Sequence, residues 1–197
     1  MKSSKVSKLV RLALLSAIIV IMAFTPLGFL NVGPFAITFI TIPVIIGAVT
    51  MGPAAGLFLG GMFGLMSFIQ CFQGSPLGSV LLTINPFLTF FNCMVPRLLM
   101  GWLCGLLYRA LNRSGKDSIA AVGTASISGA LMNTVFFMTS FILCFGNSEY
   151  VQNLQGGMNV FAFLVGMVGV NGVVEAVSCA VVGTAVSKPL LKFIKKG

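Results

Sequence analysis

The feature that most constrains this chain is a stretch from Leu12 to Pro96 that contains no Lys, Arg, Asp or Glu. A helix needs about 20 apolar residues to cross a bilayer, so a stretch of this length holds several spans. Charged residues make up only 8% of the chain, whereas soluble domains carry about 25%. The apolar runs are continuous rather than alternating, which favours helices over a β-barrel. The sequence therefore predicts an all-α membrane protein.

Turns rich in Gly, Pro and polar residues divide the apolar sequence into six helices, which form a single membrane domain over residues 1–197. The dividing segments are 25–34, 51–53, 70–79, 112–117 and 146–157. The predicted helices are 9–24, 38–49, 54–69, 86–111, 118–145 and 159–187. The second of these is short for a span unless the segment before it enters the membrane.

The basic residues are distributed as topology signals. Eleven of the twelve Lys and Arg residues lie in 2–11, 109–116 or 188–196, and six helices place these three segments on one side of the membrane. Because cytoplasmic segments are enriched in Lys and Arg, both termini are predicted to be cytoplasmic. The loops after the first, third and fifth helices carry no Lys or Arg and are long, so we expect them to face outward and cover a ligand.

Arg97 is the twelfth basic residue, and it stands alone inside the fourth predicted helix. An arginine at the centre of a bilayer costs about 2.5–3.5 kcal/mol on insertion scales, so the fold must supply a partner. Glu175 is the only acidic residue within a predicted span. One interpretation is that Arg97 and Glu175 neutralise each other in the core. The other is that both line a ligand site, where the guanidinium binds a carboxylate or phosphate.

We favour the ligand site for two reasons. A buried ion pair adds little net stability, because desolvation of the two charges offsets their attraction. Other polar residues also lie within the predicted spans, where polar groups usually face the bundle interior or a cavity. The candidate substrate-binding residues are therefore Asn92, Arg97, Asn133, Asn171 and Glu175.

Several function classes lack the residues that they need. The chain has no His and three acidic residues, and its five Cys lack C-x-x-C spacing, so no metal and no cofactor are predicted. A G-x-x-x-x-G-K-[ST] phosphate loop and a histidine-based catalytic arrangement are also absent, so the chain is predicted to be no ATPase and no other enzyme. The net charge of +9 reflects the topology signals, and nucleic acid is not a predicted partner.

Small residues at four-residue spacing mark two helix faces. Ala13 and Ala17 form one in the first helix, and Gly56, Gly60 and Gly64 form another in the third. Such patterns let helix backbones approach closely in lipid. We expect the glycines to pack inside the bundle, while the two alanines either pack inside it or dock a partner.

On these features the chain resembles the substrate-binding S-components of energy-coupling-factor (ECF) vitamin transporters. The resemblance covers nearly the whole chain and rests on six helices, cytoplasmic termini and Ala13-x-x-x-Ala17. The segments 25–28, 41–48 and 95–101 are most similar to pantothenate-type members. The resemblance implies a bacterial plasma-membrane protein that captures a water-soluble vitamin, pantothenate above all, from the outer side. Ala13 and Ala17 would dock on a transmembrane T-component, which works with two cytoplasmic ATPases.

The same resemblance suggests a role for each candidate residue. Arg97 would bind the vitamin carboxylate, and Glu175 would accept a hydrogen bond from the ligand or orient Arg97. The remaining candidates would hydrogen-bond hydroxyl or amide groups, namely Asn92, Asn133 and Asn171. The outer loops 25–37 and 71–85 would close over the site.

Other functions stay open at this point. Riboflavin- and folate-type S-components share the general layout. A membrane assembly protein would use the small-residue faces without any ligand. An autonomous secondary transporter is disfavoured, because the sequence shows no internal repeat and only one acidic residue within a span.

Overall fold

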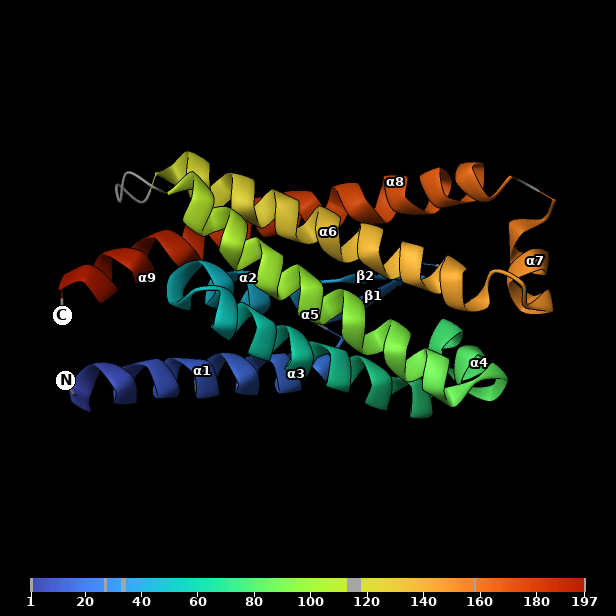
Figure 1. Cartoon of the computed structure of the whole chain (residues 1–197), viewed down its shortest axis with the longest axis horizontal. Coiled ribbons are helices and arrows are strands. Elements are labelled where there is room, and N and C mark those ends of the chain that lie inside the picture. The colour runs from blue at the N-terminus through green and yellow to red at the C-terminus, as the bar shows by residue number, and fades with distance from the viewer. Residues whose placement is uncertain (1, 27, 33–34, 113–117, 158, 197) are drawn as a thin grey trace.

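The computed structural model describes residues 2–26, 28–32, 35–112, 118–157 and 159–196; for some of these, mainly at the two ends, in the hairpin and in α8, it describes the backbone only. The elements are α1 (Lys2–Ala23), β1 (Phe29–Val32), β2 (Phe35–Thr38), α2 (Thr41–Met51), α3 (Pro53–Phe72), α4 (Pro76–Ile84), α5 (Pro86–Leu111), α6 (Ile119–Phe145), α7 (Glu149–Gln155), α8 (Val160–Ser178), the π-helical turn η1 (Cys179–Gly183) and α9 (Thr184–Lys196). The long helices run side by side along the long axis of the molecule (Figure 1).

Within the described residues, five helical segments are long and apolar enough to cross a membrane. They are Val6–Ala23, Pro53–Phe72, Pro86–Leu111, Ile119–Phe145 and Gly172–Lys192. The remaining predicted helix corresponds to α2, which has only 11 residues. At 1.5 Å per residue it measures roughly 16 Å, about half the hydrocarbon thickness.

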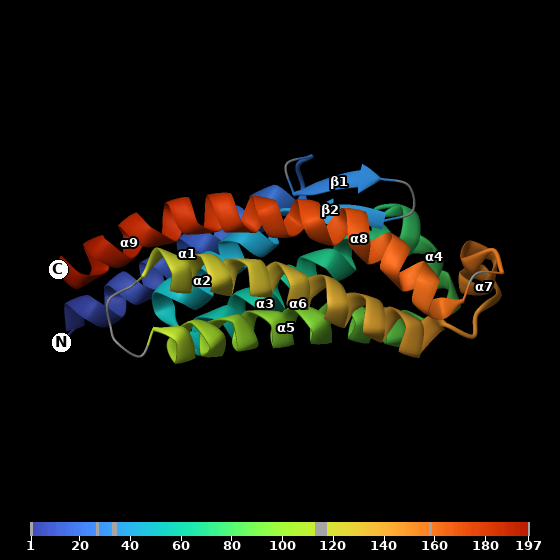
Figure 2. The ribbon, with the colours of Figure 1, turned by 90° about the horizontal axis from the view of Figure 1, so that it is seen from above.

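The chain is not purely helical, because a short hairpin precedes α2. Strands β1 and β2 pair antiparallel, with Phe29 opposite Thr38, and β2 lies beside α8 (Figure 2). The aromatic and β-branched residues of the two strands suit extended backbone. As a result α2 begins at Thr41, whereas the predicted helix begins at Thr38.

Two of the predicted loops contain helices of their own. The loop after α3 leads into α4, where Ser75 caps the helix by accepting a hydrogen bond from the backbone N–H of Gly78 over 3.4 Å. The loop after α6 contains α7, which Ser148 caps in the same way through Val151. Side chains of α4, α6 and α7 form one apolar cluster at this end of the bundle, including Leu77, Leu81, Met138, Phe141, Phe145 and Val151.

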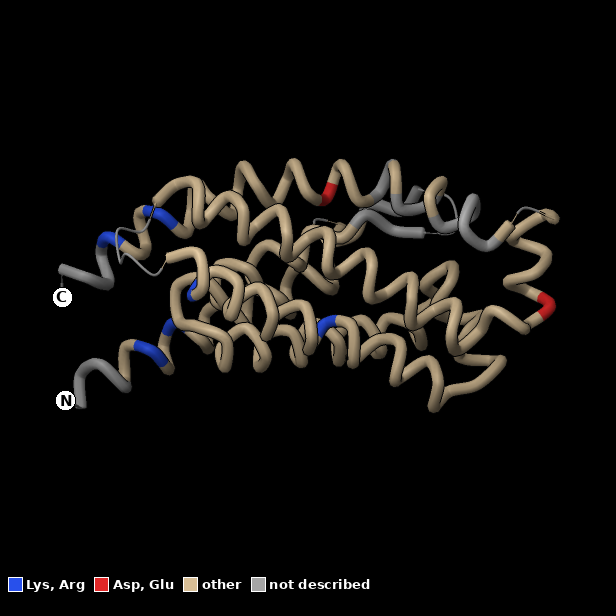
Figure 3. Tube along the Cα trace, turned by 45° about the horizontal axis from the view of Figure 1, so that its top comes forward, with Lys and Arg blue, Asp and Glu red and all other residues tan. Residues whose placement is uncertain are grey.

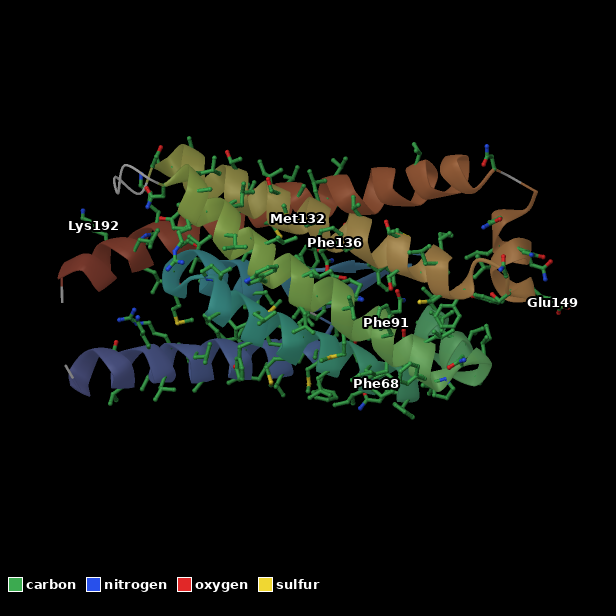
Figure 4. The ribbon with its side chains drawn as sticks, viewed as in Figure 1. Phe68, Phe91, Met132, Phe136, Glu149 and Lys192 are labelled. Atoms are coloured by element: carbon green, nitrogen blue, oxygen red, sulfur yellow. The ribbon has the colours of Figure 1, made fainter. Side chains whose placement is uncertain are left out.

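The two ends of the bundle differ in charge. Both chain ends lie at one end, while α4 and α7 lie at the other (Figure 1). Figure 3 shows the described Lys and Arg residues gathered mainly at the end that holds the termini. Lys192 and Glu149 lie at opposite ends (Figure 4). The charge distribution therefore separates the bundle into a basic end and an end without described basic residues.

Glycines bring α3 and α5 into backbone contact. Gly56 faces Gly101, and a Cβ atom on either would overlap the carbonyl oxygen of the other. A Cβ on Gly60 would overlap the carbonyl oxygen of Arg97, and one on Gly64 would lie 2.8 Å from that of Cys93. The glycine stripe of α3 thus packs inside the bundle, directly behind the part of α5 that carries Arg97.

Candidate ligand-binding cavity

A cavity of about 320 Å³ lies among α3, α4, α5, α6, α8 and the hairpin. Pockets for small-molecule ligands span about 300–1,000 Å³, so this one suits a small ligand. Arg97, near the middle of α5, and residues of α4 both line it. Helix α4 lies at the end of the bundle opposite the termini (Figure 1). The polar lining residues are Thr38, Ser67, Gln70, Gln73, Ser75, Thr89, Asn92, Arg97, Asn133, Thr134 and Glu175.

Arg97 is buried, with 6% of its surface exposed. Its guanidinium lies over two aromatic rings, 4.4 Å from the ring centroid of Phe137 and 5.3 Å from that of Phe63. Its Nη1 donates a hydrogen bond to the carbonyl oxygen of Asn92 over 2.8 Å. Its Nε has no hydrogen-bond partner among the described residues. The arginine is therefore held by rings and one carbonyl, with donor capacity left over.

The free carbonyl of Asn92 follows from the sequence. In an α-helix the carbonyl of residue 92 accepts from the N–H of residue 96, but residue 96 is Pro96, which has no N–H. Pro96 lies inside α5, so this carbonyl is available to the arginine at the next position. The side-chain oxygen Oδ1 of Asn92 is buried and has no partner among the described residues.

Glu175 is also buried, with 4% exposure. Its Oε1 accepts a hydrogen bond from Nδ2 of Asn133 over 2.9 Å, and its Oε2 accepts one from the hydroxyl of Thr134 over 3.1 Å. Among the described residues, no ion pair joins Arg97 to a carboxylate. The two opposite charges thus line one cavity with separate partners, and they do not form the directly paired core arrangement.

The cavity brings together four of the five predicted binding residues. Asn92 and Arg97 come from α5, Asn133 from α6 and Glu175 from α8. Asn171 lies one turn before Glu175 on α8, and its side chain is outside the described part of the chain. The two predicted docking residues lie elsewhere: Ala13 and Ala17 are exposed on α1.

Sequence reasoning missed several lining residues. Thr134 follows Asn133 directly, and Thr89 and Cys93 continue the face of Asn92 and Arg97 at helical spacing, so periodicity offered a signal for these three. Thr38, Ser67 and Gln70 gave no comparable signal. Gln70 donates through Nε2 to the carbonyl oxygen of Ala23, which ties the end of α3 to the end of α1.

Two of the lining residues are thiols. Cys71 of α3 and Cys93 of α5 face each other with their Sγ atoms 3.9 Å apart. Both are buried. Within the described residues, no group of three or more His, Cys, Asp or Glu side chains is placed to hold a metal ion. The lining of the cavity therefore offers one guanidinium, one carboxylate, four side-chain amides, several hydroxyls and two thiols to an organic ligand.

Comparisons with known proteins show what the chain is similar to. The model of a family described as "ECF transporter, substrate-specific component" matches residues 7–187. The chain is 32% identical to the pantothenic acid transporter PanT of Lactococcus lactis subsp. cremoris, over 98% of this chain and 97% of that protein. It is 27% identical to the pantothenate transporter PanT of Leuconostoc mesenteroides subsp. mesenteroides, over 100% of this chain and 98% of that protein.

Proposed function

Because this chain belongs to the family of substrate-specific components of ECF transporters, we propose that its cavity captures pantothenate for ATP-driven uptake. The family is one of bacterial multi-pass membrane proteins that bind substrates for transport, not of enzymes. The observation that carries the choice of ligand is Arg97, a buried guanidinium with spare donors on the wall of a cavity of about 320 Å³. The names of the two relatives support the same choice.

The carboxylate of pantothenate suits Arg97. A guanidinium presents a planar pair of donors that matches a carboxylate, and such charge-assisted hydrogen bonds are stronger than neutral ones. Phe63 and Phe137 both contact the guanidinium through their rings, so it is oriented before a ligand arrives. An anionic ligand also offsets the cost of keeping an arginine within the membrane.

The rest of pantothenate carries an amide and two hydroxyls, and the cavity offers partners for them. Asn92 and Asn133 each hold a buried side-chain oxygen without a partner in the described structure. Asn171 lies on the same helix as Glu175, and we assign it to the same polar wall. The mix of amide groups and hydroxyls favours a ligand with several hydroxyl and amide groups over a largely aromatic one.

We place the termini in the cytoplasm and the end that carries α4 and α7 outside, following the distribution of Lys and Arg. In this orientation six segments of the chain enter the membrane. Five are the long apolar helical segments, and α2 together with the hairpin forms the sixth. The hairpin and the α4 segment then form the outer cover, since Phe29, Thr38 and the residues from Ser75 to Gly78 line the cavity. Pantothenate enters from the outer side beneath them.

The energy for transport comes from partners. We assign α1 as the surface that binds a transmembrane T-component, which associates with two cytoplasmic ATPases. Ala13 and Ala17 are exposed on this helix, and the neighbouring Leu14 exposes 61% of its surface. Small side chains at four-residue spacing allow a partner helix to approach the backbone closely.

Binding of radiolabelled pantothenate to the purified protein tests the function. Arg97→Ala is expected to weaken binding by roughly 10- to 100-fold, because hydrogen bonds to charged groups contribute about 1.5–3 kcal/mol. Arg109→Ala is the matched control, since Arg109 is an exposed arginine on the same helix. Absence of binding by the wild type, or stronger competition by riboflavin or folate than by unlabelled pantothenate, contradicts the assignment. Unchanged binding by Arg97→Ala contradicts the role of the arginine.

A further inference from the structure

The amide of Asn133 is held in one orientation. An asparagine side chain can present either its NH₂ donors or its oxygen acceptor to a ligand, depending on how the amide turns. Here the amide faces Oε1 of Glu175 over 2.9 Å. Nδ2 of Asn133 donates this hydrogen bond, so the NH₂ group faces Glu175. The oxygen Oδ1 is then left without a partner among the described residues.

Glu175 is itself held in place. Its second oxygen accepts from Thr134, the residue next to Asn133 on α6. Two turns further along, Gly183 brings the same helical segment close to α6, where a Cβ atom would lie 3.0 Å from Oγ of Ser126. Movement of this segment away from α6 would break the two hydrogen bonds of Glu175. The carboxylate is therefore a fixed part of the wall.

A buried acceptor without a partner requires a donor from elsewhere, because buried polar groups are nearly always hydrogen-bonded. Asn133 is 4% exposed and lines the cavity, so a bound ligand is in a position to supply that donor. Arg97 does not supply this donor, since its Nε and Oδ1 of Asn133 are both without a partner among the described residues. That leaves a neutral part of the ligand, such as a hydroxyl group, to supply it.

We propose that Glu175 is a positioning residue that presents Asn133 as a hydrogen-bond acceptor, so that the cavity selects a ligand with a hydroxyl donor remote from its carboxylate. This inference rests on the proposed function and deepens it. It assigns Arg97 to the carboxylate end of the ligand and Asn133 to the hydroxyl end. Glu175 acts through Asn133 and does not touch the ligand.

The ligand arm of the test compares pantothenate with its two monodeoxy analogues, each lacking one hydroxyl, by titration calorimetry on the purified protein. Sites built to hydrogen-bond a hydroxyl reject the analogue that lacks it, because their polar group is left unpaired. The wild type is expected to bind one analogue roughly 10- to 100-fold more weakly than pantothenate. In Asn133→Ala the ratio of the dissociation constants of that analogue and pantothenate should fall to about 1. Arg97→Ala should weaken the binding of all three ligands by the same factor. A ratio that Asn133→Ala leaves unchanged overturns the inference.

The positioning arm compares Glu175→Gln with Glu175→Leu. Glutamine keeps an oxygen that accepts from Nδ2 of Asn133, so Glu175→Gln should retain the preference for pantothenate over the deoxy analogue. Leucine offers no acceptor and releases the amide, so Glu175→Leu should lose that preference. A merely structural role would weaken pantothenate and the analogue by the same factor in both variants, and that result overturns the inference.

Ser140→Ala is the matched control, because Ser140 is buried on α6 and does not line the cavity; it should keep the wild-type ratio. The outcomes separate the two proposals. Pantothenate binding that depends on Arg97 but shows no discrimination against either deoxy analogue overturns this inference and leaves the proposed function standing. Absence of pantothenate binding by the wild type overturns both.

Discussion

Arg97 donates a hydrogen bond to the carbonyl oxygen of Asn92, five residues earlier on the same helix. This bond is possible because Pro96 cannot supply the usual helical donor to that carbonyl. A proline within a membrane helix and an arginine within a membrane helix are each unfavourable alone. Side by side, the arginine donates to the carbonyl that the proline leaves without its helical donor, and this bond holds the guanidinium at the cavity wall.

Pro96→Ala is therefore expected to separate stability from binding. The new N–H at position 96 can bond the carbonyl of Asn92 and displace Arg97. Proline in a helix interior costs about 3 kcal/mol, so the melting temperature should rise while pantothenate affinity falls by about tenfold, equivalent to 1.4 kcal/mol. Pro189→Ala, at an exposed position of α9, should raise stability without any change in affinity. A Pro96→Ala protein that binds pantothenate as well as the wild type would show that the bond does not orient Arg97.

Gly60→Ala should displace the part of α5 that carries Arg97 and so disturb the cavity. A Cβ on Gly60 meets the carbonyl oxygen of Arg97 on α5, which is backbone and cannot turn aside. Overpacking of this kind costs about 1–3 kcal/mol, so both the melting temperature and the pantothenate affinity should fall. Gly169→Ala is the control, because a Cβ at that position of α8 has no neighbour within 4 Å. If both variants behave alike, the close approach of α3 and α5 does not position the arginine.

Ala13→Leu and Ala17→Leu should leave pantothenate binding by the isolated chain unchanged, because neither residue lines the cavity. Larger side chains keep a partner helix at a distance, so co-purification with the T-component and ATPases should be lost. Ile21→Leu, an exposed position on the same helix, should retain the complex. Should the complex be lost while no vitamin ever shifts the melting temperature, the chain would be an assembly protein without a ligand.

Chemical labelling of Cys71 and Cys93 should report whether a ligand occupies the cavity. Both line the cavity, whereas the half-buried Cys144 does not. In variants that retain only one of these cysteines, pantothenate at ten times its Kd should slow maleimide labelling of Cys71 or Cys93 by about tenfold, since about one molecule in ten is then empty. Labelling of the Cys144-only variant should not change. Equal protection of Cys144 would indicate a global change of the protein and not occupancy of the cavity.

The sequence predicted those parts of the site whose placement in a membrane is costly. Arg97 and Glu175 were recognisable because a charge within an apolar span needs a compensating environment. Neutral residues such as Thr38 and Gln70 impose a smaller cost, so nothing in the sequence marks them as parts of the lining. The bond between Asn133 and Glu175 joins two helices, and helical spacing describes neighbours on one helix only.

The fold, like the site, was predictable from the sequence only in part. Long apolar runs predicted α3, α5 and α6 to within a few residues, because membrane thickness fixes their length. The hairpin before α2 depends on pairing between two four-residue strands, which is not encoded in hydropathy. The short helix α4 depends on a cap at Ser75 and on apolar contacts with α6 and α7.

The π-helical turn η1 sets which way the last helix faces. Buried residues recur at every fourth position across it, at Glu175, Cys179, Gly183, Ser187 and Leu191. In a regular α-helix with 3.6 residues per turn, a row with a period of four drifts by about 40° at each step, which amounts to roughly 160° over the four steps. The wider turn absorbs part of this drift and keeps the row pointing inward. Removing one residue from 179–183 would rotate α9 relative to α8 about the helix axis and turn one end of the row toward lipid. The length of this segment therefore matters more than its composition.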